Sequence, residues 1–278
     1  MVKRSGVFTY GILIILLVLI CAGGYYLYYK YAKPSANPVE AIPADAGVFI
    51  KINKPGILIR NLDQENDIWR DLMTAADAAE VLEALLRIDS MAVSMGYSEF
   101  FDSESIYVAL AADSSVIKPL VVFKWPYGAS DQDLAGMLEA IGAEQEWKYE
   151  LSKGLCLLSN DEEIIEAGLQ RLQNKNPLPF AEMYERVDQT SGRNVDANIY
   201  INFDRVPGLA ESIFASSYFS DRKILPAFGT WSEIDLLVKD DELLFNGYTE
   251  AADTLDQFLS MFRRQEAQKI EVTRVLPY

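Results

Sequence analysis

The sequence predicts an α+β fold: an antiparallel sheet built from hairpin-helix units, with helices on one face and one transmembrane helix before it. Three observations predict this fold. A long uncharged run lies near the start of the chain, strand-like runs recur in pairs joined by short polar turns, and a segment with helical spacing of apolar residues follows each pair. Adjacent hairpins require antiparallel pairing, and a helix with one apolar stripe has to cover a sheet face.

The uncharged run covers the 23 residues from Val7 to Tyr29. As a helix this run is roughly 34 Å long, about the thickness of the hydrocarbon core of a bilayer. The tyrosines at its end and the following Lys30 are typical of residues that sit at a membrane interface. We therefore expect an uncleaved signal-anchor, with the lipid bilayer as a partner through residues 7–29.

Two other fates of this segment stay open. Ala22-Gly23-Gly24 is an acceptable site for cleavage by a signal peptidase. Cys21 ends the apolar run as the lipid-attachment cysteine of bacterial lipoproteins does, although Ile20 stands where that signal needs a small residue.

The basic residues around the run favour an amino terminus in the cytoplasm. Lys3, Arg4 and the terminal amine precede the run, and Lys30 and Lys33 follow it, so the bias is slight. The expected location is the bacterial inner membrane, crossed once, with the soluble domain periplasmic or otherwise extracytoplasmic.

The charge of the chain excludes nucleic acid as a partner. All 41 Asp and Glu follow Pro34, whereas four of the 25 Lys and Arg precede it, so the soluble part is more acidic than the whole chain at −16. Such a surface repels phosphate backbones. Of the two cysteines, Cys156 is alone in the soluble part, and its strand-like surroundings predict a buried, inert thiol.

Four segments follow from these patterns. We expect the transmembrane anchor over residues 1–33, a proline-rich tether over 34–40, and one α+β domain over 41–268. Residues 269–278 begin like a new strand. They are interpreted either as a closing strand of the sheet or as the start of a second domain, and we favour the second reading, in which the chain is a fragment of a longer protein.

The first strand is expected around Val48, Ile50 and Ile52, with these three side chains on its apolar side. Residues 66–95 then show helical spacing, which predicts two helices broken near residues 74–77.

Three hairpin-helix units follow. Ser130 and Asn160 are the expected amino-terminal caps of the first two helices. An additional strand, "ANIYINF", and a helix, "VPGLAESIF", lie between the second and third units. The units are "SIYVALA" and "LVVFKW" before the helix "SDQDLAGMLEAIG", "EWKYEL" and "GLCLLS" before "NDEEIIEAGLQRLQN", and "SEIDLLV" and "ELLFNGY" before "ADTLDQFLSMFRRQ".

The chain resembles an uncharacterised family of bacterial membrane-anchored proteins, defined only as a domain of unknown function. The resemblance rests on the amino-terminal run, on the opening "IPADAGVFIKI" and on the closing pattern "LLFNGYT…FLSMFRRQ…VLP". It implies an extracytoplasmic domain and no assigned activity, and it transfers no functional residues.

The chain contains no histidine. This excludes nucleophile systems that use histidine as the base, and every metal site that needs imidazole. No nucleophile elbow, phosphate-binding loop or dinucleotide-binding glycine pattern occurs, so neither a nucleotide nor a cofactor is expected. No catalytic, cofactor-binding or metal-ligating residues are assigned.

Three weaker patterns have simpler explanations. Ser115 and Lys118 match the S-x-x-K motif, but Pro119 follows in a predicted turn and the motif needs a helix. Asp63, Glu65 and Asp67 alternate as in a calcium loop that lacks its glycine and its final glutamate, so a solvated helix start is expected. Three tryptophans could line a sugar or peptide groove, and their expected place is the sheet core: Trp125, Trp147 and Trp231.

Two functions fit these observations. The first is a non-enzymatic interaction or scaffold module of the envelope that binds an envelope protein through an exposed sheet face or edge. The alternative is an envelope hydrolase that acts on glycan or peptide through paired carboxylates. A pocket that holds two acids would favour the hydrolase, and the missing catalytic residues favour the interaction module.

Overall fold

The structure is a computed structural model. It describes residues 35–64, 67–69, 71, 79–113, 116–126, 128–140, 146–174, 181–213, 225–239, 242–252 and 257–262. In chain order its elements are η1 (Pro38–Ala41), β1 (Val48–Ile52), α2 (Pro55–Gln64), α4 (Ala79–Ser94), α5 (Ser98–Ser103), β2 (Ile106–Asp113), β3 (Val116–Lys124), α6 (Asp131–Ala140), β4 (Lys148–Ser152), β5 (Leu155–Ser159), α7 (Glu162–Asn174), α8 (Ala181–Asp188), β6 (Ala197–Asn202), α9 (Val206–Ile213), β7 (Trp231–Lys239), β8 (Glu242–Glu250) and η2 (Phe258–Phe262).

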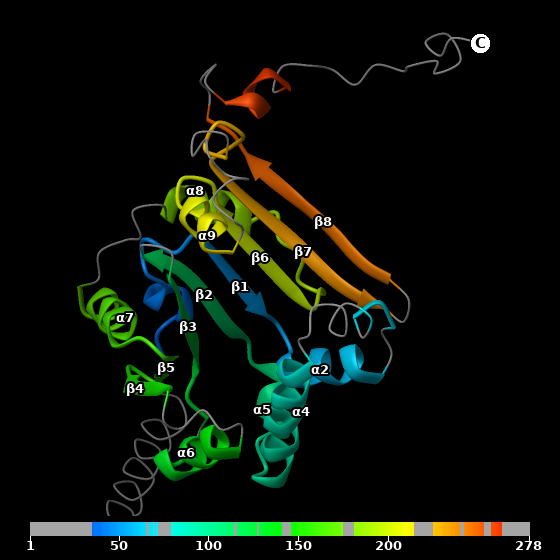
Figure 1. Cartoon of the computed structure of the whole chain (residues 1–278), viewed down its shortest axis with the longest axis vertical. Helices are drawn as coiled ribbons and strands as arrows, with labels where there is room; N and C mark the ends of the chain where they lie inside the picture. Colours follow the sequence, from blue (N-terminus) through cyan, green and yellow to red (C-terminus); the bar gives the residue numbers. More distant parts are fainter. Residues whose placement is uncertain are drawn as a thin grey trace, which may run out of the picture.

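One sheet of eight strands organises the fold, in the order β4-β5-β3-β2-β1-β6-β7-β8 (Figure 1). Every neighbouring pair is antiparallel. The three predicted hairpins are β2–β3, β4–β5 and β7–β8, and the pair β1–β6 joins them at the centre. The predicted α+β class with an antiparallel sheet is confirmed.

The register divides the strand residues between two faces. Phe49, Ala109 and Tyr200 lie opposite one another on adjacent strands, and so do Ile50, Val108 and Ile199 on the other side. Following this alternation across the sheet places each strand residue whose side chain is described. One face, which we call the charged face, carries all the charged ones: Lys51, Lys118, Lys124, Lys148, Glu150, Glu233, Asp235, Lys239, Glu242 and Glu250.

The opposite face, which we call the uncharged face, carries apolar residues with a few polar ones such as Ser232 and Thr249. Its central residues are Ile50, Val108, Leu110, Ile199, Ile201 and Ile234.

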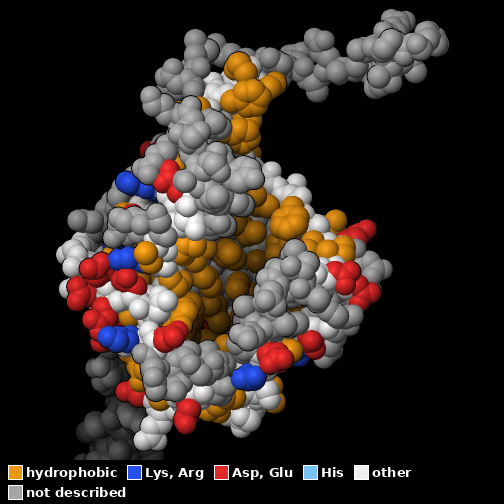
Figure 2. Space-filling model, viewed as in Figure 1, with side chains coloured by type: hydrophobic (Ala, Val, Ile, Leu, Met, Phe, Trp, Pro, Cys, Tyr) orange, Lys and Arg blue, Asp and Glu red, His pale blue; other side chains and the backbone are white. Residues whose placement is uncertain are grey.

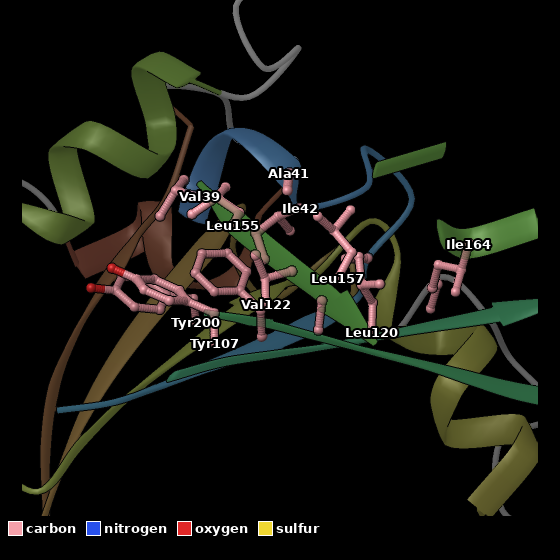
Figure 3. Close-up of a cluster of buried hydrophobic side chains, with 14 of the residues drawn as sticks. Val39, Ala41, Ile42, Tyr107, Leu120, Val122, Leu155, Leu157, Ile164 and Tyr200 are labelled. Atoms are coloured by element: carbon pink, nitrogen blue, oxygen red, sulfur yellow. The ribbon is translucent and has the colours of Figure 1, made fainter. Parts of the chain in front are cut away.

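The main core lies on the charged face. Phe49, 1% exposed, stacks on Tyr200 with ring centroids 4.6 Å apart. Helix α7 adds Ile164 and Leu172 to this cluster, and α8 adds Val187. Figure 3 shows its side chains pointing from the strands toward η1 on the same side of the sheet. Apolar side chains therefore form most of the buried part of this face, which also contains the carboxyl group of Glu233, 1% exposed.

Helices also pack on the uncharged face. Leu134 and Leu138 of α6 contact the cluster of Phe123 and Cys156, and α2 packs Leu58 and Leu62 beside Val238. At α9, a Cβ on Gly208 would lie 3.6 Å from Ala112, which belongs to this face. The prediction of helices on one face is therefore wrong. An apolar stripe shows that a helix is buried, but both faces of these strands are apolar enough to receive it.

The individual elements mostly match the prediction. The first strand is β1, but its most buried residue is Phe49, on the side opposite to the expected Val48, Ile50 and Ile52. Those three side chains are half-buried. The prediction of the inner side of this strand is therefore wrong, because the large core lies on the charged face.

The helix ends test the predicted caps. Ser130 caps α6, since its Oγ accepts from Asp133 N–H at 3.3 Å while its own N–H donates to the Asp133 carboxylate at 2.7 Å. In α7 the cap is Asp161, whose carboxylate accepts from Ile164 N–H at 3.2 Å, so the prediction of Asn160 is wrong by one residue.

The helical segments only partly follow the prediction. α4 corresponds to the second helix expected within residues 66–95, and the break near 74–77 lies outside the described residues. α2, α5 and α8 were not predicted from the sequence. Of the last predicted helix, the structure describes the short η2.

Part of the stretch expected as a tether is packed against the sheet. Ala36 N–H donates to the Lys153 carbonyl at 3.0 Å, and Val39 in η1 is 6% exposed. Residues 1–34 and 263–278, which include the predicted span and the predicted last strand, lie outside the described residues. Within the described part, no helix combines the length and apolar character needed to cross a bilayer.

Candidate functional site

Lys118, the lysine of the S-x-x-K pattern, does not lie in the helix that the motif needs. Lys118 lies in strand β3, where its ammonium donates to Glu163 at 2.7 Å and contacts Asp161 at 3.1 Å. These two hydrogen-bonded carboxylates raise the pKa of Lys118 above its usual value, so the amine stays charged and cannot act as a base. Ser115 lies outside the described residues.

The calcium-loop pattern is not a metal site in the described residues. Asp63 lies in the last turn of α2, instead of at the expected helix start, and Glu65 is outside the described residues. Within that part of the chain, no cluster of three or more cysteine, aspartate or glutamate side chains could hold a metal ion.

Cys156 is fully buried on the uncharged face, as predicted. Burial raises the pKa of its thiol to about 12. The thiol is therefore protonated near neutral pH and is a poor nucleophile.

The tryptophans belong to packed clusters, as the core interpretation predicted. Trp231 is 2% exposed in the main core. Trp125 and Trp147 pack against the cluster of Phe123 and Leu134.

A buried carboxyl group, that of Glu233, lies near the half-buried carboxylate of Asp235 on the charged face. Glu233 is 1% exposed, and Asn198 donates to its Oε1 at 3.2 Å and to Asp235 at 2.7 Å. Burial and the neighbouring Asp235 raise the pKa of Glu233 to about 8. Glu233 is therefore mostly protonated near neutral pH.

No described pocket, however, opens onto the Glu233–Asp235 pair. Four of the pockets lined by described residues hold one acid each: Asp45, Glu104, Asp133 and Glu250. The geometry that a carboxylate-pair hydrolase needs is absent from these pockets.

The centre of the uncharged face is not fully buried. Ile50, Val108, Ile199, Ile201 and Ile234 are half-buried, although they form the middle of an eight-stranded sheet. Figure 2 shows hydrophobic side chains gathered in a hollow at the centre of the molecule, in the view where Figure 1 shows β2, β1, β6 and β7. Contiguous apolar surface of this kind marks binding sites on soluble domains.

The apolar surface continues to the edge strand β8. Phe245 of the uncharged face is 61% exposed, and on the other side of the same strand Leu244 and Tyr248 are 39% and 43% exposed. Beyond the end of β8, η2 adds further exposed side chains: Phe258 at 51%, Met261 at 53% and Phe262 at 50%. Among the described residues, most of the exposed large hydrophobic side chains thus lie on β8 and η2.

We define the candidate site as the half-buried centre of the uncharged face together with Phe245 on β8. Sequence reasoning expected an exposed sheet face or edge without locating it. A signal was present in the strands: in "WSEIDLLVK" the charges stand at Glu233, Asp235 and Lys239, two or four residues apart, and therefore on one face. Tracing this spacing through every strand would have identified a face without charge.

Comparison with known proteins gives no family. No family model matches the chain, and no curated protein sequence matches it. Among solved structures, crystal form I of TP0453 has a TM-score of 0.41 at 15% identity, over 83% of this chain and 85% of that chain. Crystal form III of TP0453 has a TM-score of 0.39 at 14% identity, over 87% of both chains. Similarity at this level carries no argument about function.

Proposed function

We propose that the chain is a membrane-anchored extracytoplasmic module that binds an apolar segment of an envelope protein and catalyses no reaction. The observation that carries this proposal is the uncharged face, whose apolar centre is only partly buried while the same strands bury the main core on the charged face. The bacterial inner membrane, with the amino terminus in the cytoplasm, is the proposed location, and it rests on the uncharged run of residues 7–29.

The chemistry of the face supports an apolar contact. Ile50, Ile199 and Ile234 lie side by side on adjacent strands, with apolar neighbours on the same face. Covering such side chains stabilises a complex by about 25 cal/mol for each Å² removed from water. A charged partner segment would lose its hydration here without gaining an ion pair.

The edge strand supports a protein partner over a purely apolar ligand. β8 has nine residues and ends the sheet order, so among the described strands one side of its backbone has no pairing partner. It contains no proline or lysine, which are the residues that commonly protect strand edges. An extended segment could therefore pair with β8 and place its apolar side chains on Phe245 and the open face.

The test is retention of envelope proteins by two matched variants. Phe245→Lys places a charge on the uncharged face, and Val116→Lys places the same charge on β3, outside the candidate site. The two positions are 61% and 62% exposed, so both variants are expected to fold. Full-length protein in native membranes is cross-linked, solubilised in detergent and recovered.

Retention of a protein by the wild type and by Val116→Lys, but not by Phe245→Lys, is the expected result. Equal retention by all three proteins would show that the contact lies elsewhere. If the wild type cross-links to no protein at all, the proposed binding function is wrong.

A further inference from the structure

The molecule has a second candidate site, which is polar. It lies away from the centre of the uncharged face, between α7, the turn at residues 43–45 and the start of α9. It is a pocket of about 350 Å³ lined by Pro43, Ala44, Asp45, Ala167, Gln170, Arg171, Asn174 and Arg205. Two arginines thus face one small pocket in a chain with a net charge of −16.

Local structure fixes the backbone position of both arginines. Arg171 precedes Leu172, which is 2% exposed and belongs to the main core, so α7 cannot rotate its charged residue away. Arg205 follows a turn in which Asp204 N–H donates to Asn202 Oδ1 at 3.0 Å and Arg205 N–H donates to the Asn202 carbonyl at 3.1 Å. Gly47 lets this turn approach closely, because a Cβ there would lie 3.1 Å from the Arg205 carbonyl carbon.

The charge of these arginines is not neutralised by the described residues. Arg60, Arg87 and Arg186 form ion pairs with acids, whereas neither Arg171 nor Arg205 has a carboxylate within ion-pair distance in the described part of the chain. The Nε of Arg171 is buried there without a hydrogen-bond partner. Burial also lowers the pKa of Arg171 below its usual value, which shows that its charge is partly desolvated.

A role for Arg171 in stabilising α7 would explain only part of this arrangement of two arginines without carboxylate partners. Arg171 lies in the last turn of α7, where a positive charge interacts favourably with the helix dipole. That interaction does not require a second arginine across a pocket or a buried Nε without a partner. Asp45, which also lines the pocket, pairs with neither arginine, so the lining keeps a positive excess.

We propose that this pocket binds a small oxyanion, a phosphate or carboxylate group, between Arg171 and Arg205. A guanidinium group presents parallel N–H donors that match two oxygens of such a group. The acidic surface elsewhere repels anions, so binding would be confined to this pocket. This site is independent of the protein contact proposed above.

The experiment measures the thermal stability of the full chain in detergent micelles as inorganic phosphate is added, with chloride at matched ionic strength as the reference. An anion that binds the folded state raises the unfolding temperature. Arg171→Gln and Arg205→Gln are expected to weaken phosphate binding by about tenfold or more, because each removes a charged hydrogen-bond donor. Arg193→Gln, at an exposed arginine outside the pocket, is the matched control.

Asp45→Asn gives an independent readout. It removes the acid that opposes the anion, so phosphate binding should become tighter, a change that a merely structural role of the arginines does not predict. If Arg171→Gln does not fold, Arg205→Gln and Asp45→Asn decide the matter, since both positions are exposed. No phosphate response in the wild type, or the same response in all four variants, would overturn the proposal.

The source of the oxyanion is tested by the surrounding lipid. The phosphate response is repeated with the full chain in nanodiscs of neutral lipid and in nanodiscs that contain phosphatidylglycerol. A response that disappears in the anionic discs indicates that a lipid headgroup occupies the pocket. A response that persists in both indicates a soluble anion.

Discussion

The two faces of the sheet are built from the same eight strands, yet the helices and turns of the chain cover them to different extents. On the charged face, helices bring acids and bases to the strand charges, as Asp161 and Glu163 do for Lys118. On the uncharged face the helices contribute apolar contacts at the flanks, through α2, α6 and α9, and the centre stays half-buried. The chain itself thus buries a core over the centre of the charged face, although Leu244 and Tyr248 at its β8 edge are exposed. The apolar centre of the uncharged face stays only partly buried.

The comparison also separates stability from binding. A residue in the closed core contributes to folding because its burial is complete without a partner. A half-buried residue contributes less to folding and keeps part of its apolar area available for a complex. Neighbouring residues of one strand should therefore differ in their effect on unfolding.

The largest expected effect compares two consecutive residues of β1. Phe49→Ala removes a ring that is 1% exposed and stacked on Tyr200, and it should lower the free energy of unfolding by about 3–5 kcal/mol. Ile50→Ala, on the half-buried face, should lower it by less than about 2 kcal/mol. Urea unfolding of the full chain in detergent, followed by circular dichroism, measures both. Equal losses would show that the uncharged face is as closed as the other.

The next effect concerns pH and the buried acid of the charged face. Glu233 has a pKa of about 8 in the folded chain and 4.5 in the reference state, so the folded form keeps a proton that the unfolded form releases. Stability should therefore fall as pH rises between these values, by up to about 1.4 kcal/mol per pH unit. Glu233→Gln should remove this slope, as measured by urea unfolding at several pH values.

A control for this pH effect lies on the same face. Glu242→Gln removes an acid that is exposed, and the slope should survive this substitution. A slope that is unchanged in Glu233→Gln would mean that the proton is held elsewhere.

The smallest effect tests how α7 is fixed over the charged face. Asp161→Ala removes the cap of α7 and should reduce the free energy of unfolding by about 1 kcal/mol. Asn160→Ala changes the exposed residue just before it and should leave stability nearly unchanged. Thermal unfolding of the two variants measures the difference. A larger loss of stability in Asn160→Ala than in Asp161→Ala would show that Asn160 is the cap.

The local features of the chain were determined by the sequence itself. Strand alternation and short polar turns predicted the hairpins β2–β3, β4–β5 and β7–β8, because pairing partners that are close in sequence need little information beyond the turn. The turn at Lys153 and Gly154, with φ of 49° and 74°, is of this local kind. The S-x-x-K motif was rejected because Pro119 argues against a helix, and Lys118 indeed lies in a strand. The turn predicted at Pro119 is wrong, because this residue also lies within β3 and pairs with Leu110.

The tertiary structure decided what depends on contacts between distant segments. The pairing of β1 with both β2 and β6 determines whether Phe49 or Ile50 faces the main core. A one-residue change of register would exchange the two faces, and an apolar helix stripe does not specify which face it covers. The same holds for Arg171 and Arg205, which are far apart in the sequence and line one pocket together with Pro43, Ala44 and Asp45 only through the tertiary structure.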